Sequence, residues 1–597
     1  MDRKGIIAVT LAVVGLVIWQ INYSRQMDVY QRAKRAADAE AAAAEKAKHP
    51  DATAETPKNS TAPAANATST PGTPKVEEKL ERITTPSVEY AFTNLGGGIA
   101  RVVLLKHIAE PGGKRAGDLE TKVTLNAYGD LPIGAVVEST GDDARLPFTA
   151  TINDQTGEAT FERTDNRQLQ TVKKFTVVKE PGGRDEYLVG FDLTFNNQSQ
   201  QAISVPGYLV HTGSAGPVHR LDLANYTGFD WYTGGNTFKD VTSFHSGGIF
   251  GFGRVEQPTF SLGGINANWA GVTNQYFCTI ITPSNAKAAG VWCEKFGIDE
   301  SAVPAATPDA APSGANLLGV HGALSMAGFT LVPGQSVTQH FDIYAGPREY
   351  NRLKKLGGDQ DEIMDFGTYI KFVSEALLGS MNWLHSHLGS YAAAIIVLTL
   401  IIRSLMWPLQ NKSTESMKKM QALGPRMNEL KEKYQDDPQR MNMEVMKLYK
   451  ENGVNPLSGC LPMFIQIPIF WGLFRMLGKA VELRNSHFLW VHDLSQPDTI
   501  AHLLGKPLNI LPLCMAATML VQMRLSPKTG DDTQQKVLMF MPVIFVLFCY
   551  NYASALALYW TVQNLFSIGQ LYVTRNRTTP VLVLPSGGKR SKKKGNR

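Results

Sequence analysis

The sequence predicts a multi-domain membrane protein: an α-helical bundle of six membrane spans, a large all-β domain and a helical hairpin. Three observations support this fold class. Long apolar segments occur at the N-terminus and repeatedly in the last third of the chain. The region between them consists of short runs that alternate apolar and polar residues, as strands do. A basic, helix-patterned segment interrupts the apolar ones.

The first predicted element is a membrane anchor at residues 1–25. Its apolar run GIIAVTLAVVGLVIWQINY follows two basic residues and precedes no small-residue cleavage site, so we expect an uncleaved signal anchor. Residues 26–83 are rich in Ala, Thr and Pro and contain few large apolar residues. Such a composition buries too little surface to offset chain entropy, which predicts a disordered linker.

Residues 84–347 are predicted to form an all-β domain, a sandwich of two large antiparallel sheets. The run YLVGFDLTFNN has apolar residues at alternate positions, namely Val189, Phe191, Leu193 and Phe195. This period of two indicates a strand with one buried face. Turn signals such as PGG and NNQS separate this run from similar ones.

Overall charge and cysteine content say little about function, whereas the C-terminal tail carries a strong charge signal. The net charge of +6 over 597 residues is nearly balanced and indicates no partner. The tail at 576–597 is strongly basic, which suits RNA, the ribosome or anionic lipid but equally a solubilising end. No two cysteines have CxxC spacing, and the pairing of Cys278 with Cys293 stays open, because a large domain has little need of a disulfide.

The last third predicts an amphipathic helix at the membrane surface in 348–387 and a five-helix core in 388–575. The apolar segments of this core lie near 388–409, 458–478, 508–525, 537–553 and 556–574. Prolines interrupt several of them. Prolines are tolerated in membrane helices where neighbouring helices or water satisfy the freed carbonyl groups.

Loop charge predicts the orientation of these spans. One set of alternate loops, with the C-terminus, carries 19 Lys and Arg residues, and the other set carries three. Because basic loops remain in the cytoplasm, both termini are expected there and the β domain is expected in the periplasm of a bacterial inner membrane. Basic residues directly after the first span favour the opposite orientation, but five downstream spans outweigh them.

The basic segment 411–455 predicts a cytoplasmic helical hairpin. Two helical stretches flank a turn at Asp437 and Pro438, where Asp437 suits an N-cap. Methionines recur at helical spacing along the hairpin, namely Met417, Met420, Met427 and Met441. Such a stripe is typical of a seam between two helices, and an adaptable surface for apolar clients is the alternative.

The most informative residue is Arg403, within the apolar run VLTLIIRSLMWPL. A charge at the centre of a membrane helix costs at least ~2.5–3.5 kcal/mol, and the predicted core spans contain no carboxylate to pair with it. Arg403 therefore either extends to the cytoplasmic interface near Pro408 or lines a hydrated cavity. Arg475, near the outer end of its span, is expected to extend to the interface.

Polar residues in the same spans are candidates for lining such a cavity. In the last span, one polar stripe at i, i+3, i+4 and i+7 consists of Trp560, Gln563, Asn564 and Ser567. The other candidates are Thr399, Gln466, Gln522 and Tyr559. Interhelical hydrogen bonding explains the same pattern, so the residues by themselves leave both interpretations open.

Several runs resemble those of the YidC-type membrane insertase family: IIRSLMWPLQNKSTESMKKMQALGPRMNELKEKY, NPLSGCLPMFIQIPIFWGLF, WVHDLSQPD and LALYWTVQNLFSIGQ. The resemblance extends over about residues 366–575, and the anchor and large outer domain match the Gram-negative form. It implies a hydrophilic groove open to cytoplasm and lipid, with Arg403 at its centre and Thr399 beside it. Trp560 stands where some members have a client-contacting tyrosine, which leaves a hydrogen bond from this position in doubt.

The resemblance also implies a β-supersandwich of sugar-epimerase type outside the membrane and a hairpin that receives clients. The implied partners are nascent membrane proteins, membrane lipids and the Sec translocon, with the chain working as a monomer and without a cofactor. A small-solute transporter or channel is the alternative function. No phosphate-binding loop, zinc spacing or nucleophile motif favours an enzyme. His385 and His387 lack a third metal ligand and are expected to be an interfacial pair beside Trp383.

Overall fold

The structure is a computed structural model that describes residues 76–110, 121–138, 144–179, 184–220, 222–246, 255–303, 317–367, 369–455, 461–503, 506–526 and 532–574. The predicted anchor at 1–25, most of the predicted linker and the basic tail at 576–597 lie outside these residues. The chain divides into two compact units, one of Val76–Pro527 with Pro542–Arg597 and one of Met1–Lys75 with Lys528–Met541. All contacts reported below lie within the first unit.

The predicted β domain is present, and its described strand pairings are antiparallel. A nine-stranded sheet has the order β13 (Asn236–Asp240), β12 (Gly228–Tyr232), β17 (Trp269–Thr273), β18 (Phe277–Pro283), β22 (Ser336–Pro347), β9 (Leu188–Asn197), β8 (Leu169–Val177), β7 (Glu158–Thr164) and β6 (Thr149–Asn153). A five-stranded sheet has the order β16 (Thr259–Ala267), β19 (Ala288–Ile298), β20 (Leu317–Met326), β11 (Tyr208–Ala215) and β5 (Val136–Val137).

A third, four-stranded sheet was not foreseen. Its order is β1 (Leu80–Thr84), β2 (Val88–Thr93), β3 (Gly98–Glu110) and β4 (Thr121–Leu125). Strand β1 begins inside the predicted linker, which corrects that boundary. Its single buried residue, Ile83, gives too weak a pattern to be recognised in the sequence. Three small ribbons pair β10 (Ile203–Val205) with β21 (Phe329–Leu331), β14 (His245–Ser246) with β15 (Val255–Glu256) and β23 (Thr499–Leu503) with β24 (Lys506–Asn509).

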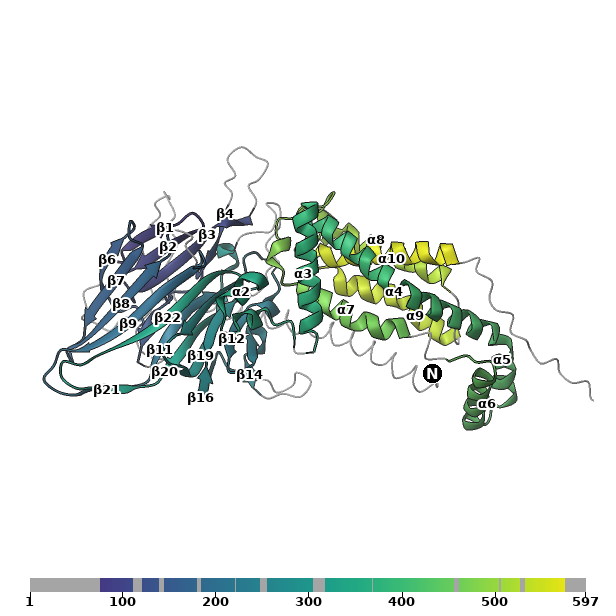
Figure 1. The fold of residues 1–597 in the computed structure, drawn as a ribbon, viewed down its shortest axis with the longest axis horizontal. Helices are drawn as coiled ribbons and strands as arrows, with labels where there is room; N and C mark the ends of the chain where they lie inside the picture. Colours follow the sequence, from purple (N-terminus) through teal and green to yellow (C-terminus); the bar gives the residue numbers. More distant parts are fainter. Residues whose placement is uncertain are drawn as a thin grey trace, which may run out of the picture. The chain divides into compact units, whose positions relative to one another are not determined.

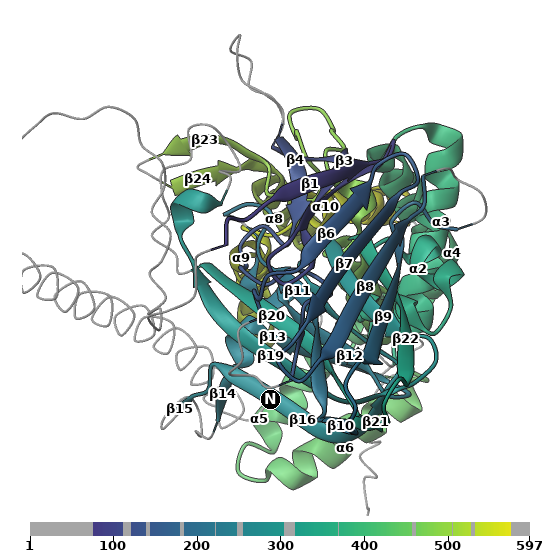
Figure 2. The same cartoon turned by 90° about the vertical axis from the view of Figure 1, so that its left-hand side faces the viewer.

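Alternating burial holds the sheets together as the sequence predicts. Figure 2 shows β7, β8, β9 and β22 side by side, and every second residue of β9 is buried. Phe191 of β9 stacks on Phe175 of β8 at 4.5 Å between ring centroids, and Phe92 of the four-stranded sheet lies 5.6 Å from Phe175. Burial of each phenylalanine side chain stabilises the folded state by about 1.5–3 kcal/mol. Because Phe92 and Phe175 belong to different sheets, this aromatic row joins the four-stranded sheet to the nine-stranded one.

The two domain cysteines do not pair. Cys278 on β18 and Cys293 on β19 belong to different sheets, and both are free and buried. They therefore act as small apolar residues of the core.

The last third is helical, as predicted (Figure 1). Its helices are α2 (Tyr350–Leu356), α3 (Lys371–Leu388), α4 (Tyr391–Ala422), α5 (Gly424–Lys433), α6 (Pro438–Glu451), α7 (Leu461–Leu477), α8 (Ile510–Leu525), α9 (Asp532–Cys549) and α10 (Ser554–Thr574). Short 3-10 turns are η1 (Ala224–Tyr226), η2 (Val241–Ser243), η3 (Glu300–Ala302), η4 (Gln360–Met364) and η6 (Val481–Leu483). Helix α10 packs against α4 and α8, and α3 packs against α4 and α7.

Each of the five predicted core spans coincides with one of the helices α4, α7, α8, α9 and α10. Within the described part of the chain, α4 alone is both long and apolar enough to cross a membrane by length and composition. Shorter apolar helices occur at Phe464–Leu477, Ile510–Leu525 and Phe540–Cys549. The helical core is therefore established, and the count of six spans stays a prediction.

Helix α4 continues through the boundary predicted between membrane span and hairpin. Ser390 caps its N-terminus, since its Oγ accepts a hydrogen bond from the Ala393 N–H at 3.4 Å. Pro408 lies inside the helix without ending it. At a rise of 1.5 Å per residue the helix is about 48 Å long. It therefore joins the apolar region to the hairpin without a loop.

The segment predicted as a cytoplasmic hairpin is helical, and its first helical stretch is divided. Helix α4 ends at Ala422, Leu423 forms the junction, and α5 begins at Gly424 with a proline in its first turn. The turn follows the prediction, because the Asp437 carboxylate accepts a hydrogen bond from the Arg440 N–H at 3.0 Å and so caps α6.

The hairpin methionines divide between its seam and its surface. Met420 packs on a small core of Leu423, Leu448 and Val454. The Met427 sulfur accepts a hydrogen bond from the Tyr449 hydroxyl at 3.3 Å, across the two arms. Met417 and Met441 are half-buried. The predicted stripe is thus a helix seam at Met420 and Met427.

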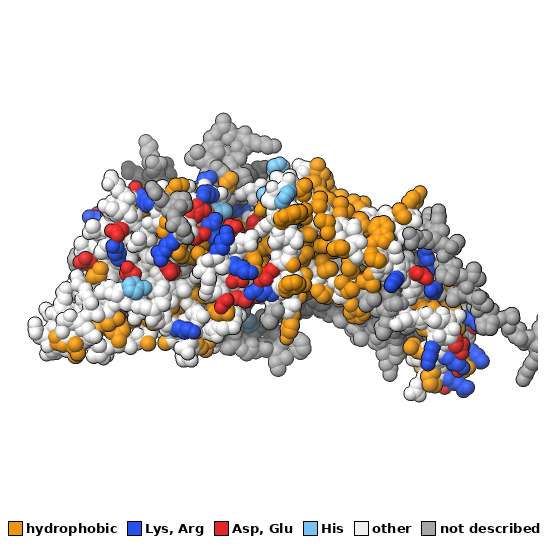
Figure 3. All heavy atoms as spheres, in the orientation of Figure 1, with side chains coloured by type: hydrophobic (Ala, Val, Ile, Leu, Met, Phe, Trp, Pro, Cys, Tyr) orange, Lys and Arg blue, Asp and Glu red, His pale blue; other side chains and the backbone are white. Residues whose placement is uncertain are grey.

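A wide apolar surface covers the helices. In Figure 3 hydrophobic side chains gather over the region of α4 and α7, whereas charged side chains gather at α5 and α6. Large exposed apolar side chains on α4, α7, α8 and α10 include Leu400, Ile401, Leu405, Phe464, Ile467, Trp471, Leu513, Leu520, Val521, Leu565 and Val573. A soluble protein rarely exposes such a continuous apolar surface, so these helices are built to contact lipid.

Candidate functional site

Arg403 lies in the middle of α4 and is half-buried. Its guanidinium makes no hydrogen bond or ion pair with any residue that the structure describes. One helical turn earlier, Thr399 is buried and its hydroxyl donates to the Ile395 carbonyl at 2.6 Å. Thr399 is therefore satisfied by its own helix, while the donors of Arg403 remain available for water or a bound group.

Tyr559 and two glutamines form a polar cluster near Arg403. Gln466 of α7 donates through Nε2 to the Tyr559 hydroxyl at 3.1 Å and is 3.4 Å from Oε1 of Gln563 on α10. Tyr559 lies within electrostatic range of Arg403. We call Arg403, Gln466, Tyr559 and Gln563 the polar cluster. It joins α4, α7 and α10 at the depth of the apolar surface.

The predicted polar stripe on α10 separates into different environments. The Asn564 amide donates to the Thr518 hydroxyl of α8 at 3.1 Å, and the Ser567 hydroxyl donates to the Gln563 carbonyl at 3.0 Å. Asn564 therefore fixes α10 to α8, as the interhelical alternative expects. The Gln522 side chain makes no hydrogen bond with the described residues.

Trp560 makes aromatic contacts and takes no part in the hydrogen bonds of the polar cluster. Its ring is 4.9 Å from that of Phe470 on α7 and 4.4 Å from that of Phe545 on α9. The reason is geometric: positions 559 and 560 are about 100° apart around an α-helix. The adjacent Tyr559 hence occupies the polar side, and Trp560 packs with aromatic rings.

Two contacts that the sequence did not suggest extend the polar side of α10 toward the hairpin. Gln570 Nε2 donates to Asn411 Oδ1 of α4 at 3.2 Å. Lys418 Nζ donates to the Thr574 carbonyl at 3.2 Å. Gln570 lies seven residues after Gln563 and so on the same helical face, a spacing that a search continued along α10 would have found.

Arg475, expected to extend to the interface, pairs with a carboxylate outside the predicted spans. Its Nη1 is 3.0 Å from Oδ2 of Asp365, and Lys479 Nζ is 2.9 Å from the same oxygen. Asp365 follows η4 and lies outside all predicted spans, so the apolar runs of the sequence do not reveal this ion pair. Burial, followed by the charge of Arg348, lowers the pKa of Lys479, although Asp365 acts to raise it.

The two histidines at the end of α3 lie against aromatic rings. His387 is 4.5 Å from the Trp383 ring, and His385 stacks on Tyr391 at 3.7 Å. Within the described residues no group of three potential metal ligands occurs.

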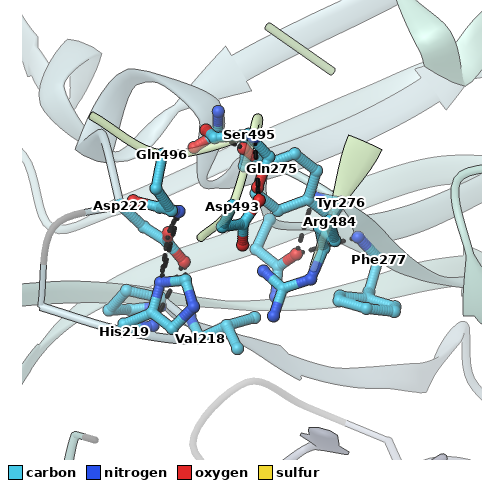
Figure 4. Close-up of polar contacts among 12 residues, drawn as sticks. Val218, His219, Asp222, Gln275, Tyr276, Phe277, Arg484, Asp493, Ser495 and Gln496 are labelled. Atoms are coloured by element: carbon cyan, nitrogen blue, oxygen red, sulfur yellow. Dashed lines mark hydrogen bonds and ion pairs between the residues drawn. The ribbon is translucent and has the colours of Figure 1, made fainter. Parts of the chain in front are cut away.

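A second polar cluster joins the β domain to the segment after α7 (Figure 4). Gln275 Nε2 donates to the Gly478 carbonyl at 2.8 Å, and the Tyr276 hydroxyl donates to the Ser495 carbonyl at 3.0 Å. Arg484 stacks on the Tyr276 ring, with its guanidinium carbon 5.0 Å from the ring centroid. We call this contact the domain seam.

A histidine–aspartate pair adds to the domain seam. His219 Nδ1 lies 3.0 Å from Oδ1 of Asp222, and the Gln496 amide approaches that oxygen at 3.5 Å. Burial acts to raise the pKa of Asp222, but His219 and then Arg484 hold it below its ordinary value. Asp222 therefore remains ionised. One carboxylate oxygen faces His219 and Gln496 at the domain seam, and the other accepts a hydrogen bond from the Val218 N–H of its own loop at 2.7 Å.

An apolar helical core with a polar centre, attached to a large β domain, is typical of an integral membrane protein with a large domain outside the bilayer. The family model described as "YidC periplasmic domain" matches residues 81–379, and the model described as "60Kd inner membrane protein" matches residues 383–580. The membrane protein insertase YidC of Syntrophus aciditrophicus is 32% identical over 507 residues, covering 83% of this chain and 85% of that protein. The corresponding protein of Oleidesulfovibrio alaskensis is 30% identical over 591 residues, covering 95% and 98%.

The chain belongs to the YidC family of membrane protein insertases. As a member of this family it is a non-enzymatic insertase of the inner membrane with a periplasmic β-rich domain. The alternative of a small-solute transporter or channel finds no support in these comparisons.

Two solved structures show low similarity. A crystal structure of an active YidC insertase with the first transmembrane domain resolved is 18% identical, covers 84% of this chain and 94% of that chain, and gives a TM-score of 0.33. A galactose mutarotase related enzyme from Lactobacillus acidophilus is 11% identical, covers 45% and 97%, and gives a TM-score of 0.26. Such scores carry no argument, so the predicted β-supersandwich stays a prediction.

Proposed function

We propose that the polar cluster is the centre of a hydrophilic groove that receives the polar outer segment of a nascent membrane protein. The observation that supports this best is Arg403, which lies among apolar helices without a partner in the described residues. A buried cation requires water or an anion. An acidic client residue supplies that anion, and its attraction to Arg403 is stronger in a poorly screened site than at a surface.

The groove lowers the barrier to insertion without forming a bond. Gln466, Tyr559 and Gln563 replace part of the water that the polar client segment loses at membrane depth. The apolar part of the client then leaves the groove sideways into lipid, a transfer that is favourable without any further energy source. The ion pair with Arg403 has to be temporary, because a permanent one would retain the client.

The orientation belongs to the same proposal. Six spans, with both termini and the hairpin in the cytoplasm and the β domain outside, follow from loop charge. In this arrangement the client first meets the hairpin, where Met443 and Met446 of α6 are exposed. Flexible methionine side chains adapt to varied apolar segments. Assistance from the Sec translocon, ribosome contact through the basic tail and action as a monomer stay predictions.

Insertion into vesicles that contain only the full chain tests the groove. We expect Arg403→Lys to insert a small client with an acidic outer segment nearly as well as wild type. Arg403→Ala should insert it at least about tenfold less, because tenfold corresponds to only 1.4 kcal/mol and an unpaired membrane charge costs more. Arg524→Ala is the matched control, since Arg524 is exposed at the end of α8. Equal insertion by wild type and both Arg403 variants would contradict the groove and favour an Arg403 side chain that extends to the membrane interface.

A further inference from the structure

Glu482 is a buried acid that the groove does not use. It lies in η6, the short turn after α7, between the buried side chains of Val481 and Leu483. Its carboxyl faces α3, where Asn382 Nδ2 donates to Glu482 Oε1 at 3.3 Å. The remaining oxygen atoms of this pair, Glu482 Oε2 and Asn382 Oδ1, are both buried and have no hydrogen-bond partner among the described residues.

These two unpaired oxygens identify the protonation state that fits the contact. An ionised carboxylate only accepts hydrogen bonds, so it satisfies the amide N–H₂ of Asn382 and leaves the amide oxygen without a donor. A protonated carboxyl has one O–H and supplies that donor. A single proton on Glu482 therefore satisfies both unpaired atoms, as in an acid–amide pair with two hydrogen bonds. An unsatisfied buried polar atom costs about 1–3 kcal/mol.

The surroundings of Glu482 also favour the neutral acid. Burial raises the pKa of Glu482 to about 7, with a smaller contribution from the negative charge of Glu349 before α2, although its own backbone N–H and the Asn382 amide act to lower it. From α4, Tyr391 lies within electrostatic range of both carboxyls, and His385 of α3 stacks on Tyr391. Arg484 is two residues away, but its Nη2 donates to the Ile108 carbonyl of the β domain at 3.0 Å.

We propose that Glu482 is a proton-binding residue that fastens α3 to the turn after α7, and that its ionisation loosens this contact. The contact connects the helix at the membrane surface to the segment that also carries the domain seam. The proposal is independent of the groove, because Glu482 lies outside the polar cluster.

The pH dependence has a definite sign. The native contact keeps its proton up to about pH 7, whereas an opened contact loses it near the ordinary value of 4.5. Between these values the closed contact binds more protons than the opened one. Opening therefore becomes easier by up to about tenfold per pH unit as pH rises from 5 to 7, and is constant above that.

Infrared spectroscopy and hydrogen exchange of the full chain in lipid vesicles test the proposal. We expect Glu482→Gln to remove a protonated-carboxyl band that wild type shows at pH 6 and loses by pH 8.5. Exchange protection of the peptides around Asn382 and Glu482, corrected for intrinsic rates, should fall between pH 5 and pH 7 in wild type. It should stay constant in Glu482→Gln, because the glutamine amide forms both hydrogen bonds with Asn382 at any pH.

Glu349→Gln is the matched control. It removes the neighbouring negative charge, so the band and the loss of protection should persist with a lower midpoint pH. The proposal is overturned if wild type lacks the band at pH 6, or if its protection follows the same pH course as that of Glu482→Gln. The infrared measurement at pH 6 uses the wild-type protein only, so it tests the proposal even if Glu482→Gln does not fold.

Discussion

At the scale of single residues, Lys173 shows how the β domain holds a buried lysine without an acidic partner. Its amine donates to the carbonyl groups of Gly96 and Gly134 at 2.7 Å and 3.0 Å. It also lies 4.6 Å from the centroid of the Phe148 ring. Burial, followed by the charge of Arg163, lowers the pKa of Lys173 to about 7. The residue thus joins the four-stranded sheet, β8 and the loop before β5.

Replacement of Lys173 by Met should remove a pH dependence of stability. Between pH 7 and its ordinary pKa of 10.5, the folded lysine is neutral while the unfolded one is charged. The unfolded state then binds more protons, so wild-type stability should rise with pH in this window by up to about 1.4 kcal/mol per unit. Hydrogen exchange of β8 and β9 measures this slope, which Lys173→Met should abolish.

Lys174→Met is the control for that prediction. Lys174 is the adjacent residue, is half-exposed and pairs with Glu158 at 2.7 Å. The slope between pH 7 and pH 10.5 should survive this change. A slope that vanishes equally in both variants would show that Lys173 is not its source.

At the scale of helices, α3 and α7 approach each other closely at a glycine. A Cβ added to Gly472 of α7 would lie 3.0 Å from Cγ1 of Val373 and 3.4 Å from Oγ of Ser374. The same Ser374 hydroxyl donates to the Gly472 carbonyl at 3.3 Å. Glycine therefore allows α3 to pack on the backbone of α7.

Gly472→Leu should push α3 away from α7. Overpacking of a well-packed contact costs about 1–3 kcal/mol, so we expect exchange protection to fall along 373–381 and much less along α10. Gly569→Leu is the control, because a Cβ at this helical glycine of α10 meets nothing within 4 Å. Unchanged protection of α3 in Gly472→Leu would contradict the close packing.

Helices and strands were largely predictable, because their signals are local. Alternation predicted β9, and Asp437 with Pro438 predicted the start of α6. The failures have physical causes at the same scale. Helix α4 runs through Pro408 across the boundary predicted between span and hairpin, and it ends at Ala422, just before the Gly424–Pro425 pair. Trp560 and Gln563 share a helix but not an environment, because Phe470 and Phe545 from other helices surround the tryptophan.

At the scale of the whole molecule, the domain seam attaches the β domain to the core through residues far apart in the sequence. Tyr276 and Ser495, for example, are 219 positions apart. Periodic patterns in a sequence indicate local secondary structure and not contacts between distant segments, so the domain seam was not predicted. The polar cluster was foreseen in its membership but not in its pairings, since Gln466 and Tyr559 come from separate helices.

A seam variant tests this attachment. Gln275→Ala with Tyr276→Phe removes the hydrogen bonds to Gly478 and Ser495, which together contribute about 1–3 kcal/mol. Exchange in residues 478–498 should accelerate by roughly tenfold, while exchange in α6 should not change. Tyr128→Phe is the control, because the Tyr128 hydroxyl donates to the Pro217 carbonyl at 3.1 Å within the β domain. Equal exchange in the seam variant and this control would show that these bonds do not hold the segment.

Pro408 of α4 and Pro468 of α7 affect the polar cluster in a way that side chains do not reveal. Proline has no N–H, so each one leaves the carbonyl four residues earlier without its helical donor. These carbonyls belong to Ser404, next to Arg403, and to Phe464, two residues before Gln466. The main chain thus offers one acceptor atom next to Arg403 in α4 and one near Gln466 in α7. Proline, a residue without any polar side-chain atom, therefore adds hydrogen-bond acceptors to the two helices that carry Arg403 and Gln466.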